Sequence, residues 1–296
     1  MANKNIDTTN KSYVKYINPK HAVPREIRFL RLNFNILSTI STRLATKLAL
    51  KLFYRPRRSP YSQEELEKLN DGESFTYQYK DYHLKVTTWG EGKPVLFMHG
   101  WDGKGIQIIK FIDPLVKMGL KVIIIDAPGH GQSSGKNVDI TNFMESILLI
   151  QENFGPLYGI IAHSFGGLAT ILSLLQNKLA IEKIVLISSP ASVDTVMDSF
   201  KAIFKLKDNI IENIKINANK RTGLSMWKSP TNDELNTIQQ PILLIHDTTD
   251  SIMPFMDVVK LGNSLQNTKF MKTTGLGHRR ILKDPQVISN VLGFLN

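Results

Sequence analysis

Residues 157–175, which read LYGIIAHSFGGLATILSLL, constrain the fold of this chain more than any other stretch. The apolar run at residues 157–162 predicts a buried strand, and apolar residues at helical spacing in the second half predict a helix. Ser164 therefore falls at the turn between them. Ala162 and Gly166 stand two positions before and two after the serine, and a sharp turn packed against neighbouring backbone needs small residues there.

This turn fits the nucleophile-elbow pattern G-x-S-x-G, with Ala162 in place of the first glycine. Alanine is the smallest departure from glycine, so the pattern is weakened but not lost. Five residues alone would equally suit an ordinary glycine-rich helix start. The interpretation therefore depends on the surrounding chain.

Apolar strands alternate with helices along most of the sequence. Helical spacing recurs at residues 106–118, 143–154 and 285–295. This alternation predicts a mostly parallel sheet with helices on both faces, in which a ligand lies outside the carboxyl ends of the strands. The polar motifs of the chain all follow those ends. Besides the strand before Ser164, the expected strands are a hairpin of residues 75–79 and 82–88, then 95–98, 122–125, 184–187, 242–245 and 269–272.

Length and composition indicate one large core. The 296 residues are 42% hydrophobic, and no second region of comparable size stands out. The chain has no cysteine, which excludes disulfides, thiolate nucleophiles and Cys-ligated zinc.

The net charge of +11 is confined to the N-terminal segment. Residues 1–60 hold 13 of the 37 basic residues and two of the 26 acidic ones, so the remaining 236 residues hold 24 of each sign. The body of the protein is neutral, and no nucleic-acid-binding motif is recognisable. We therefore expect no nucleic-acid partner.

The N-terminal segment is predicted to be an appendage. Residues 1–24 read as a flexible arm without a secretory signal, and residues 25–53 show amphipathic spacing for one long helix or for two joined near residues 38–42. A linker at residues 55–60 and a Glu-rich turn at residues 63–69 follow. The expected division is a basic arm and amphipathic helix in residues 1–60 and a main domain in residues 61–296.

Two interpretations of the amphipathic helix in residues 25–53 stay open. Its apolar stripe could pack on its own domain or on a second subunit and leave the charges solvated. Alternatively, the basic helix could lie on an anionic membrane or beside the mouth of the site, since each Lys or Arg near such a surface adds about 1 kcal/mol. The stretch is too polar to span a bilayer, which needs about 20 mainly apolar residues. With no secretory signal visible, the expected location is cytoplasmic, at most peripheral to the membrane.

Four separated motifs follow strand ends in a definite order: His99-Gly100-Trp101, residues 126–133 (DAPGHGQS), the turn at Ser164, and then Asp250 with His278. Each motif alone is modest, but together and in this order the sequence resembles the α/β-hydrolase family over roughly residues 75–296. The resemblance implies an α/β-hydrolase fold with a small helical cap at about residues 190–240.

The resemblance also implies the roles of the site residues. Serine is a poor nucleophile until a base removes its proton, and the family order Ser, Asp, His makes Ser164 the nucleophile, His278 the base and Asp250 the residue that orients the base. The backbone N–H groups of Trp101 and Phe165 are the expected oxyanion hole. No metal or organic cofactor is expected.

Three other histidines are given structural roles. The resemblance makes His99 part of the oxyanion loop rather than the base. His163, beside the nucleophile, is expected to pack or to form a hydrogen bond, and His130 belongs to the glycine-rich loop.

Two other aspartates, Asp247 and Asp126, could be mistaken for the acid that orients the base. Asp247 stands where the family commonly has glycine, so the resemblance favours Asp250. Asp126 is expected to organise its loop as a hydrogen-bond acceptor.

The cap is expected to present an apolar helical face, either to an acyl chain or simply to the core. Its residues are Met197, Phe200, Phe204, Leu206 and Ile210.

The function predicted is hydrolysis of a carboxylic ester, or of a similar acyl bond in a small apolar molecule, through an acyl-enzyme. Relatives with a carboxylate nucleophile, the haloalkane dehalogenases and epoxide hydrolases, are disfavoured by Ser164. Hydrolysis of carbon–carbon bonds by the same three residues stays open, as does a catalytically silent ligand-binding member, because fold does not guarantee activity.

Overall fold

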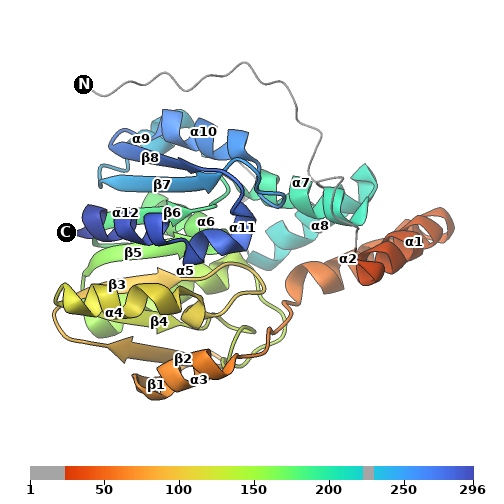
Figure 1. The fold of residues 1–296 in the computed structure, drawn as a ribbon. Helices are drawn as coiled ribbons and strands as arrows, with labels where there is room; N and C mark the ends of the chain where they lie inside the picture. The colour runs from red at the N-terminus through yellow and green to blue at the C-terminus, as the bar shows by residue number, and fades with distance from the viewer. Residues whose placement is uncertain (1–23, 223–229) are drawn as a thin grey trace.

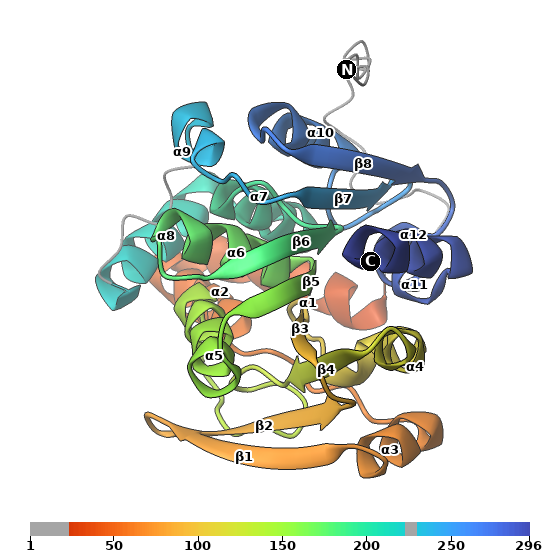
Figure 2. The same cartoon turned by 90° about the vertical axis from the view of Figure 1, so that its left-hand side faces the viewer.

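The computed structural model describes residues 24–222 and 230–296. Its centre is an eight-stranded sheet in the order β1-β2-β4-β3-β5-β6-β7-β8 (Figures 1 and 2). The strands β1 and β2 form an antiparallel hairpin at one edge, β2 is antiparallel to β4, and every other pair is parallel. The prediction of a mostly parallel sheet is confirmed. The strands are β1 Glu73–Tyr79, β2 Tyr82–Trp89, β3 Lys93–Met98, β4 Leu120–Ile125, β5 Leu157–His163, β6 Ile181–Ile187, β7 Ile242–Asp247 and β8 Thr268–Thr273.

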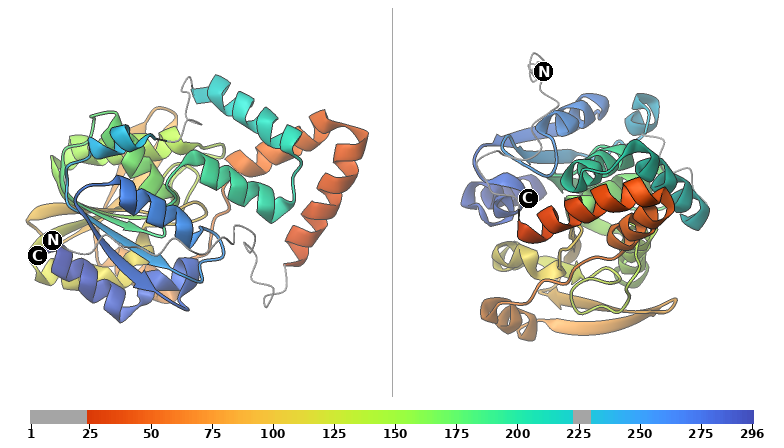
Figure 3. Two further views of the ribbon diagram at one scale, coloured as in Figure 1. Left: turned by 90° about the horizontal axis from the view of Figure 1, so that it is seen from above. Right: turned by 90° about the vertical axis from the view of Figure 1, so that its right-hand side faces the viewer.

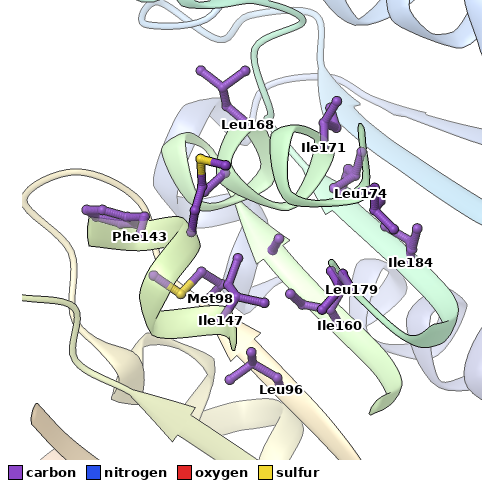
Figure 4. Close-up of a cluster of buried hydrophobic side chains, with 14 of the residues drawn as sticks. Leu96, Met98, Phe143, Ile147, Ile160, Leu168, Ile171, Leu174, Leu179 and Ile184 are labelled. Carbon is purple, nitrogen blue, oxygen red and sulfur yellow. The ribbon is translucent and has the colours of Figure 1, made fainter. Parts of the chain in front are cut away.

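Helices cover both faces of the sheet, because the central strands are apolar on both sides. On one face Leu96 and Met98 of β3 pack with α5 and α6; on the other Val95 and Phe97 pack with α4 and α12. Figure 4 shows the first of these clusters, in which Phe143 and Ile147 of the helix layer lie over the strands. The helices of the two layers are α4 Ile109–Lys117, α5 Ile140–Phe154, α6 Phe165–Leu175, α9 Asn232–Asn236, α10 Phe255–Ser264, α11 Gly277–Arg280 and α12 Pro285–Leu295.

Residues 63–69, predicted as a turn, instead form the helix α3 Gln63–Asn70. Ser62 accepts a hydrogen bond from the backbone N–H of Glu65, and the Glu65 side chain accepts one from the N–H of Ser62. This reciprocal pair satisfies two of the amide groups that a helix start leaves without partners, and it allows so short a helix to begin. The S-x-x-E spacing of this helix start is visible in the sequence at Ser62 and Glu65.

The N-terminal amphipathic stretch is two helices, α1 Arg25–Ile40 and α2 Thr42–Tyr54. The break is at Ser41, which has an extended backbone, so the two-helix form of the prediction is confirmed. No helix in the described ranges is long and apolar enough to cross a membrane. The flexible arm predicted for the first 24 residues lies outside the described residues except for Pro24.

The helices α1 and α2 pack on two helices that follow β6, α7 Val193–Phe204 and α8 Asp208–Thr222. Their contact is a separate apolar cluster in which Phe34, Ala45 and Ala49 meet Met197 and Ile210. All four helices lie beyond the carboxyl ends of the parallel strands (Figures 1 and 3). The interpretation that the N-terminal helices pack on their own domain therefore holds for one face of α1.

Candidate active site

Ser164 occupies a strained position between β5 and α6. Its backbone is left-handed, with φ 53° and ψ −121°, a conformation that costs a non-glycine residue about 1–3 kcal/mol. The chain can turn this sharply only because Gly166 has no side chain: a Cβ there would lie 2.5 Å from the carbonyl oxygens of both Met98 and His99. The turn places the serine at the carboxyl edge of the sheet, where it lines a cavity.

His278 and Asp250 meet this serine although they lie far from it in sequence. His278 Nε2 is 3.0 Å from Ser164 Oγ, and His278 Nδ1 is 2.7 Å from Asp250 Oδ2. His278 lies on α11, just after β8, and Asp250 follows β7, so neighbouring parallel strands bring the two together. The three side chains therefore form one continuous chain of hydrogen bonds.

The two rival acids have different surroundings. The Asp250 side chain is fully buried; its Oδ1 accepts the N–H groups of Ile252 and Met253, and its Oδ2 faces His278. Burial alone would raise the pKa of Asp250, but the hydrogen bond and charge of His278 lower it overall. Asp250 thus stays ionised beside the imidazole.

The carboxylate of Asp247 is used entirely within its own loops. Its two oxygens accept hydrogen bonds from the backbone N–H of Leu276 and from the hydroxyls of Thr249 and Thr273, among others. Burial would raise the pKa of Asp247, yet these hydrogen bonds lower it to about 2. Asp247 braces the turn that leads to His278 and does not contact it.

His99 and His130 are embedded in loops around the site. The Ala127 N–H donates to His99 Nε2 at 3.0 Å, so the proton of the neutral ring is on Nδ1 and is donated to the Gly100 carbonyl. His130 makes the same kind of bridge from the Pro128 carbonyl to the backbone N–H of Asp102. Neither ring contacts Ser164, in agreement with the structural roles predicted for both.

Asp126 holds the glycine-rich loop together. One carboxylate oxygen accepts the backbone N–H of Gly105, and the other accepts the N–H of Gln132 and the hydroxyl of Tyr61. This is the loop-organising role that the sequence predicts.

His163 contacts His278. Its Nε2 donates to the backbone carbonyl of His278 at 2.8 Å, and the two rings lie 4.8 Å apart. Burial first, and then the neighbouring His278, lower the pKa of His163 to about 3. The ring therefore stays neutral and fixes the backbone that carries His278.

Mild acid is expected to destabilise the fold because of such histidines. In the unfolded chain His163 binds a proton near its usual pKa of 6.5, and in the folded chain only near 3, so the unfolded state holds more protons between these values and stability falls as pH falls. For His163 alone the loss from neutral pH to about pH 5 is about 2 kcal/mol. Burial lowers the pKa of His99, His130 and His246 as well, which adds to the loss.

Urea unfolding at the two pH values measures this loss. A His163→Asn variant keeps a donor for the His278 carbonyl and should lose less stability on acidification than the wild type. Equal free energies of unfolding at neutral pH and at about pH 5 would contradict the prediction.

Two backbone N–H groups near Ser164 have no acceptor among the described residues. In the described chain neither the amide of Trp101 nor that of Phe165 donates to an acceptor of the protein. The loop before Trp101 runs close to Ser164, since a Cβ on Gly100 would lie 2.8 Å from the Ser164 Cβ. Phe165 is the first residue of α6, where helix N–H groups lack partners within the helix.

The cavity at Ser164 has a volume of about 240 Å³. Residues of α2, α7 and α8 wall it, and the rings of Trp101 and Phe165 meet at 5.4 Å beside Ser164. Most of the surface is apolar, and its aliphatic and aromatic lining consists of Leu52, Phe53, Tyr54, Trp101, Val138, Ile140, Phe165, Val193, Val196, Phe200, Ile203, Ala218, Ile252 and Met253.

The predicted cap residues divide between two roles. Only Phe200 lines the cavity. The others, Met197, Phe204, Leu206 and Ile210, belong to the cluster with α1 and α2, because the N-terminal helices cover that side of the cap. The sequence does not predict that residues 52–54 form part of the cavity wall. Their amphipathic spacing indicates that they are buried, but not which surface they contact.

Charged side chains at the cavity are mostly paired. The guanidinium of Arg57 lies 3.2 Å from Asp102, and Arg221 binds Asp139 at 2.7 Å. Arg279 also lines the cavity. Among the described residues no three His, Asp or Glu side chains are placed to hold a metal ion.

This arrangement matches known proteins in sequence and in fold. Residues 92–236 match the family model described as serine aminopeptidase, S33. The AB hydrolase superfamily protein YisY of Bacillus subtilis is 21% identical over 250 residues, covering 71% of this chain and 93% of that protein. The sn-1-specific diacylglycerol lipase ABHD11 of Danio rerio is 30% identical over 117 residues, covering 38% of this chain and 37% of that protein.

Among solved structures, a lipase-like protein from Acinetobacter baumannii, described as a putative lipase, superposes with a TM-score of 0.60 at 20% identity and covers 80% of this chain and 97% of its own. The sheet order and the turn at Ser164 define an α/β hydrolase. The chain belongs to the α/β-hydrolase fold family, and within that superfamily it is a serine hydrolase.

Proposed function

We propose that this serine hydrolase cleaves carboxylic esters of small apolar molecules through an acyl-enzyme on Ser164. The observation that carries the proposal is the hydrogen-bond chain from Asp250 through His278 to Ser164, which ends in an apolar cavity. Residues 61–296 would form the hydrolase domain, with the cap near residues 190–240, and the N-terminal helices would close one side of its cavity.

The geometry supports a two-step reaction. His278 Nε2 accepts the Ser164 proton as Oγ attacks the ester carbonyl, and Asp250 stabilises the resulting imidazolium. The N–H groups of Trp101 and Phe165 bind the negative oxygen of the tetrahedral intermediate. His278 then gives its proton to the departing alcohol, and water, activated by the same imidazole, releases the acid from the serine.

The lining favours an uncharged, apolar substrate. A site for a free amino terminus would need a carboxylate to pair with the ammonium group, but Asp102 and Asp139, the carboxylates on the described wall, are each bound to an arginine. Apolar side chains around the serine instead gain free energy by covering hydrocarbon, at about 25 cal/mol per Å² buried. Esters of acyl chains or aromatic acids fit this surface best.

Labelling with a fluorophosphonate tests the nucleophile. The probe should add its mass to Ser164 in the wild type and leave Ser164→Ala unlabelled. Absence of labelling in folded wild-type protein would overturn the proposal and favour a silent ligand-binding member.

A series of p-nitrophenyl esters then tests the substrate class. Activity should rise with acyl length until the cavity is filled, and Phe200→Ala should shift the optimum to longer chains because it removes part of the wall. Phe34→Ala is the matched control: its ring packs on Phe204, 6.0 Å between centroids, and does not line the cavity, whereas the Phe204 ring itself lies 4.9 Å from that of Phe200. Equal shifts in both variants, or no preference for apolar chains, would contradict this assignment.

A further inference from the structure

A row of large apolar side chains on α1 faces solvent. Phe29, Leu32, Ile36 and Ile40 are 48–72% exposed, whereas most large apolar side chains of the described chain are covered. At 100° per residue the four lie within an arc of about 80°. We call them the α1 stripe; the opposite side of the helix, with Phe34, packs on the cap.

Basic residues are frequent on α1, which carries the stripe, and on α2, which follows it. In residues 25–54 there are six Lys and Arg and one acidic residue, Glu26. Arg25 and Arg28 lie at the start of α1, and the exposed face of α2 carries Arg43, Lys47 and Lys51. None of these five makes a salt bridge with a carboxylate of the described residues, so their charge is available to a partner.

The geometry points to an anionic lipid surface as the partner of the α1 stripe. An interfacial helix buries an apolar face at the level of the acyl chains while flanking Lys and Arg meet headgroup phosphates. Each basic residue near such a surface raises binding about fivefold. The four apolar side chains supply the part of the binding that salt does not screen.

A second copy of the chain fits this face less well. In a two-fold dimer the same patch meets itself, which here would bring two basic surfaces together. Residues 1–23 are no better suited as a cover, since they hold four lysines and one aspartate and so have the same sign of charge. A negatively charged bilayer offers the complementary charge and the apolar layer at once.

Binding through the α1 stripe would also fix how the cavity is oriented relative to the bilayer. The helix α2 follows directly from α1, and its last residues, Leu52 to Tyr54, form part of the cavity wall. Docking by α1 therefore turns toward the membrane the end of the molecule that holds the cavity, beyond the carboxyl ends of the parallel strands. This inference concerns binding alone and does not require catalytic activity, so its failure and that of the proposed function are separate.

Co-flotation of the full-length protein with vesicles tests the inference. The protein should float with phosphatidylcholine–phosphatidylglycerol vesicles, much less with phosphatidylcholine alone, and less at high salt. The variant F29Q/L32Q/I36Q/I40Q removes only exposed side chains and should lose at least tenfold in binding at any salt concentration. R25Q/R28Q/K47Q should lose about a hundredfold at low salt and most of its salt dependence.

Matched controls use residues far from α1. Leu66→Gln replaces another exposed apolar residue, and K117Q/K178Q/K269Q removes the same number of exposed positive charges near the opposite ends of the strands. Both should bind like the wild type. Three results would overturn the inference: no flotation of the wild type, equal loss in the control variants, or a wild-type dimer that the α1-stripe variant converts to a monomer in sedimentation without any vesicle binding.

Discussion

Replacing Ser164 with alanine is expected to lower kcat for the best p-nitrophenyl ester about 10⁶-fold, with KM little changed. The reason is that the hydroxyl 3.0 Å from His278 Nε2 is the atom that becomes acylated, and no second nucleophile lies in this chain of hydrogen bonds. What activity remains would come from the oxyanion donors and from binding alone. Steady-state kinetics with thermal unfolding of the same samples measures the effect on folded protein.

A double variant gives the sharper control. If Ser164 and His278 act as one unit, Ser164→Ala/His278→Ala should be no slower than Ser164→Ala, because the histidine has no proton left to move. Additive losses would mean that His278 contributes in some other way. A Ser164→Ala variant within tenfold of the wild type would remove the serine from the reaction altogether.

Much of the fold is predictable from the sequence because the parallel strands are buried on both faces. Such strands read as continuous apolar runs, so the segments that became β3 to β7 stand out without any partner being known. The nucleophile turn is visible for a related reason: the closeness of Gly166 to the Met98 and His99 carbonyls leaves room for glycine only. The sharp turn and the close packing against β3 therefore both require glycine at position 166.

The wall of the cavity could not be predicted from the same patterns. Amphipathic spacing shows that one face of α2 is buried, but not that its last residues, 52–54, line the cavity at Ser164 rather than the core. That depends on contacts over long sequence distances, such as the hydrogen bond from the Val138 N–H to the Tyr54 carbonyl. For the same reason the cap residues were expected to share one face, although most of them pack on α1 and α2.

In the sequence, only the family resemblance favours Asp250 over Asp247 as the acid that orients His278. The structure supplies a physical reason for this preference. Asp247 has its oxygens occupied by Leu276, Thr249 and Thr273, while one oxygen of Asp250 faces His278. The carboxylate of Asp247, at the end of β7, therefore stabilises the loop. The next acidic residue along the chain is free to orient the imidazole.

Asp250→Asn and Asp247→Asn are therefore expected to fail in different ways. In Asp250→Asn the amide has almost the same shape, but it either donates to His278 Nδ1 or offers a neutral oxygen, so the correct tautomer and the imidazolium both lose support. We expect kcat per folded molecule to fall about 10⁴-fold, and a loss of about 1–3 kcal/mol in the free energy of unfolding as well, because Asp250 Oδ1 also accepts the N–H groups of Ile252 and Met253. In Asp247→Asn the hydrogen bonds to a charged acceptor are weakened, and we expect a loss of about 1–3 kcal/mol in the free energy of unfolding.

Paired measurements of kcat and urea unfolding separate the two effects. Per folded molecule, Asp247→Asn should stay within about tenfold of the wild-type kcat, since His278 keeps its partner 2.7 Å away. The pH dependence adds a second readout, because the pKa of Asp247 is held at about 2 and its ionised form contributes stability that is lost only as pH falls below about 4. The opposite pattern, an inactive but stable Asp247→Asn beside an active Asp250→Asn, would move the orienting role to Asp247 and require the loop after β7 to rearrange when substrate binds.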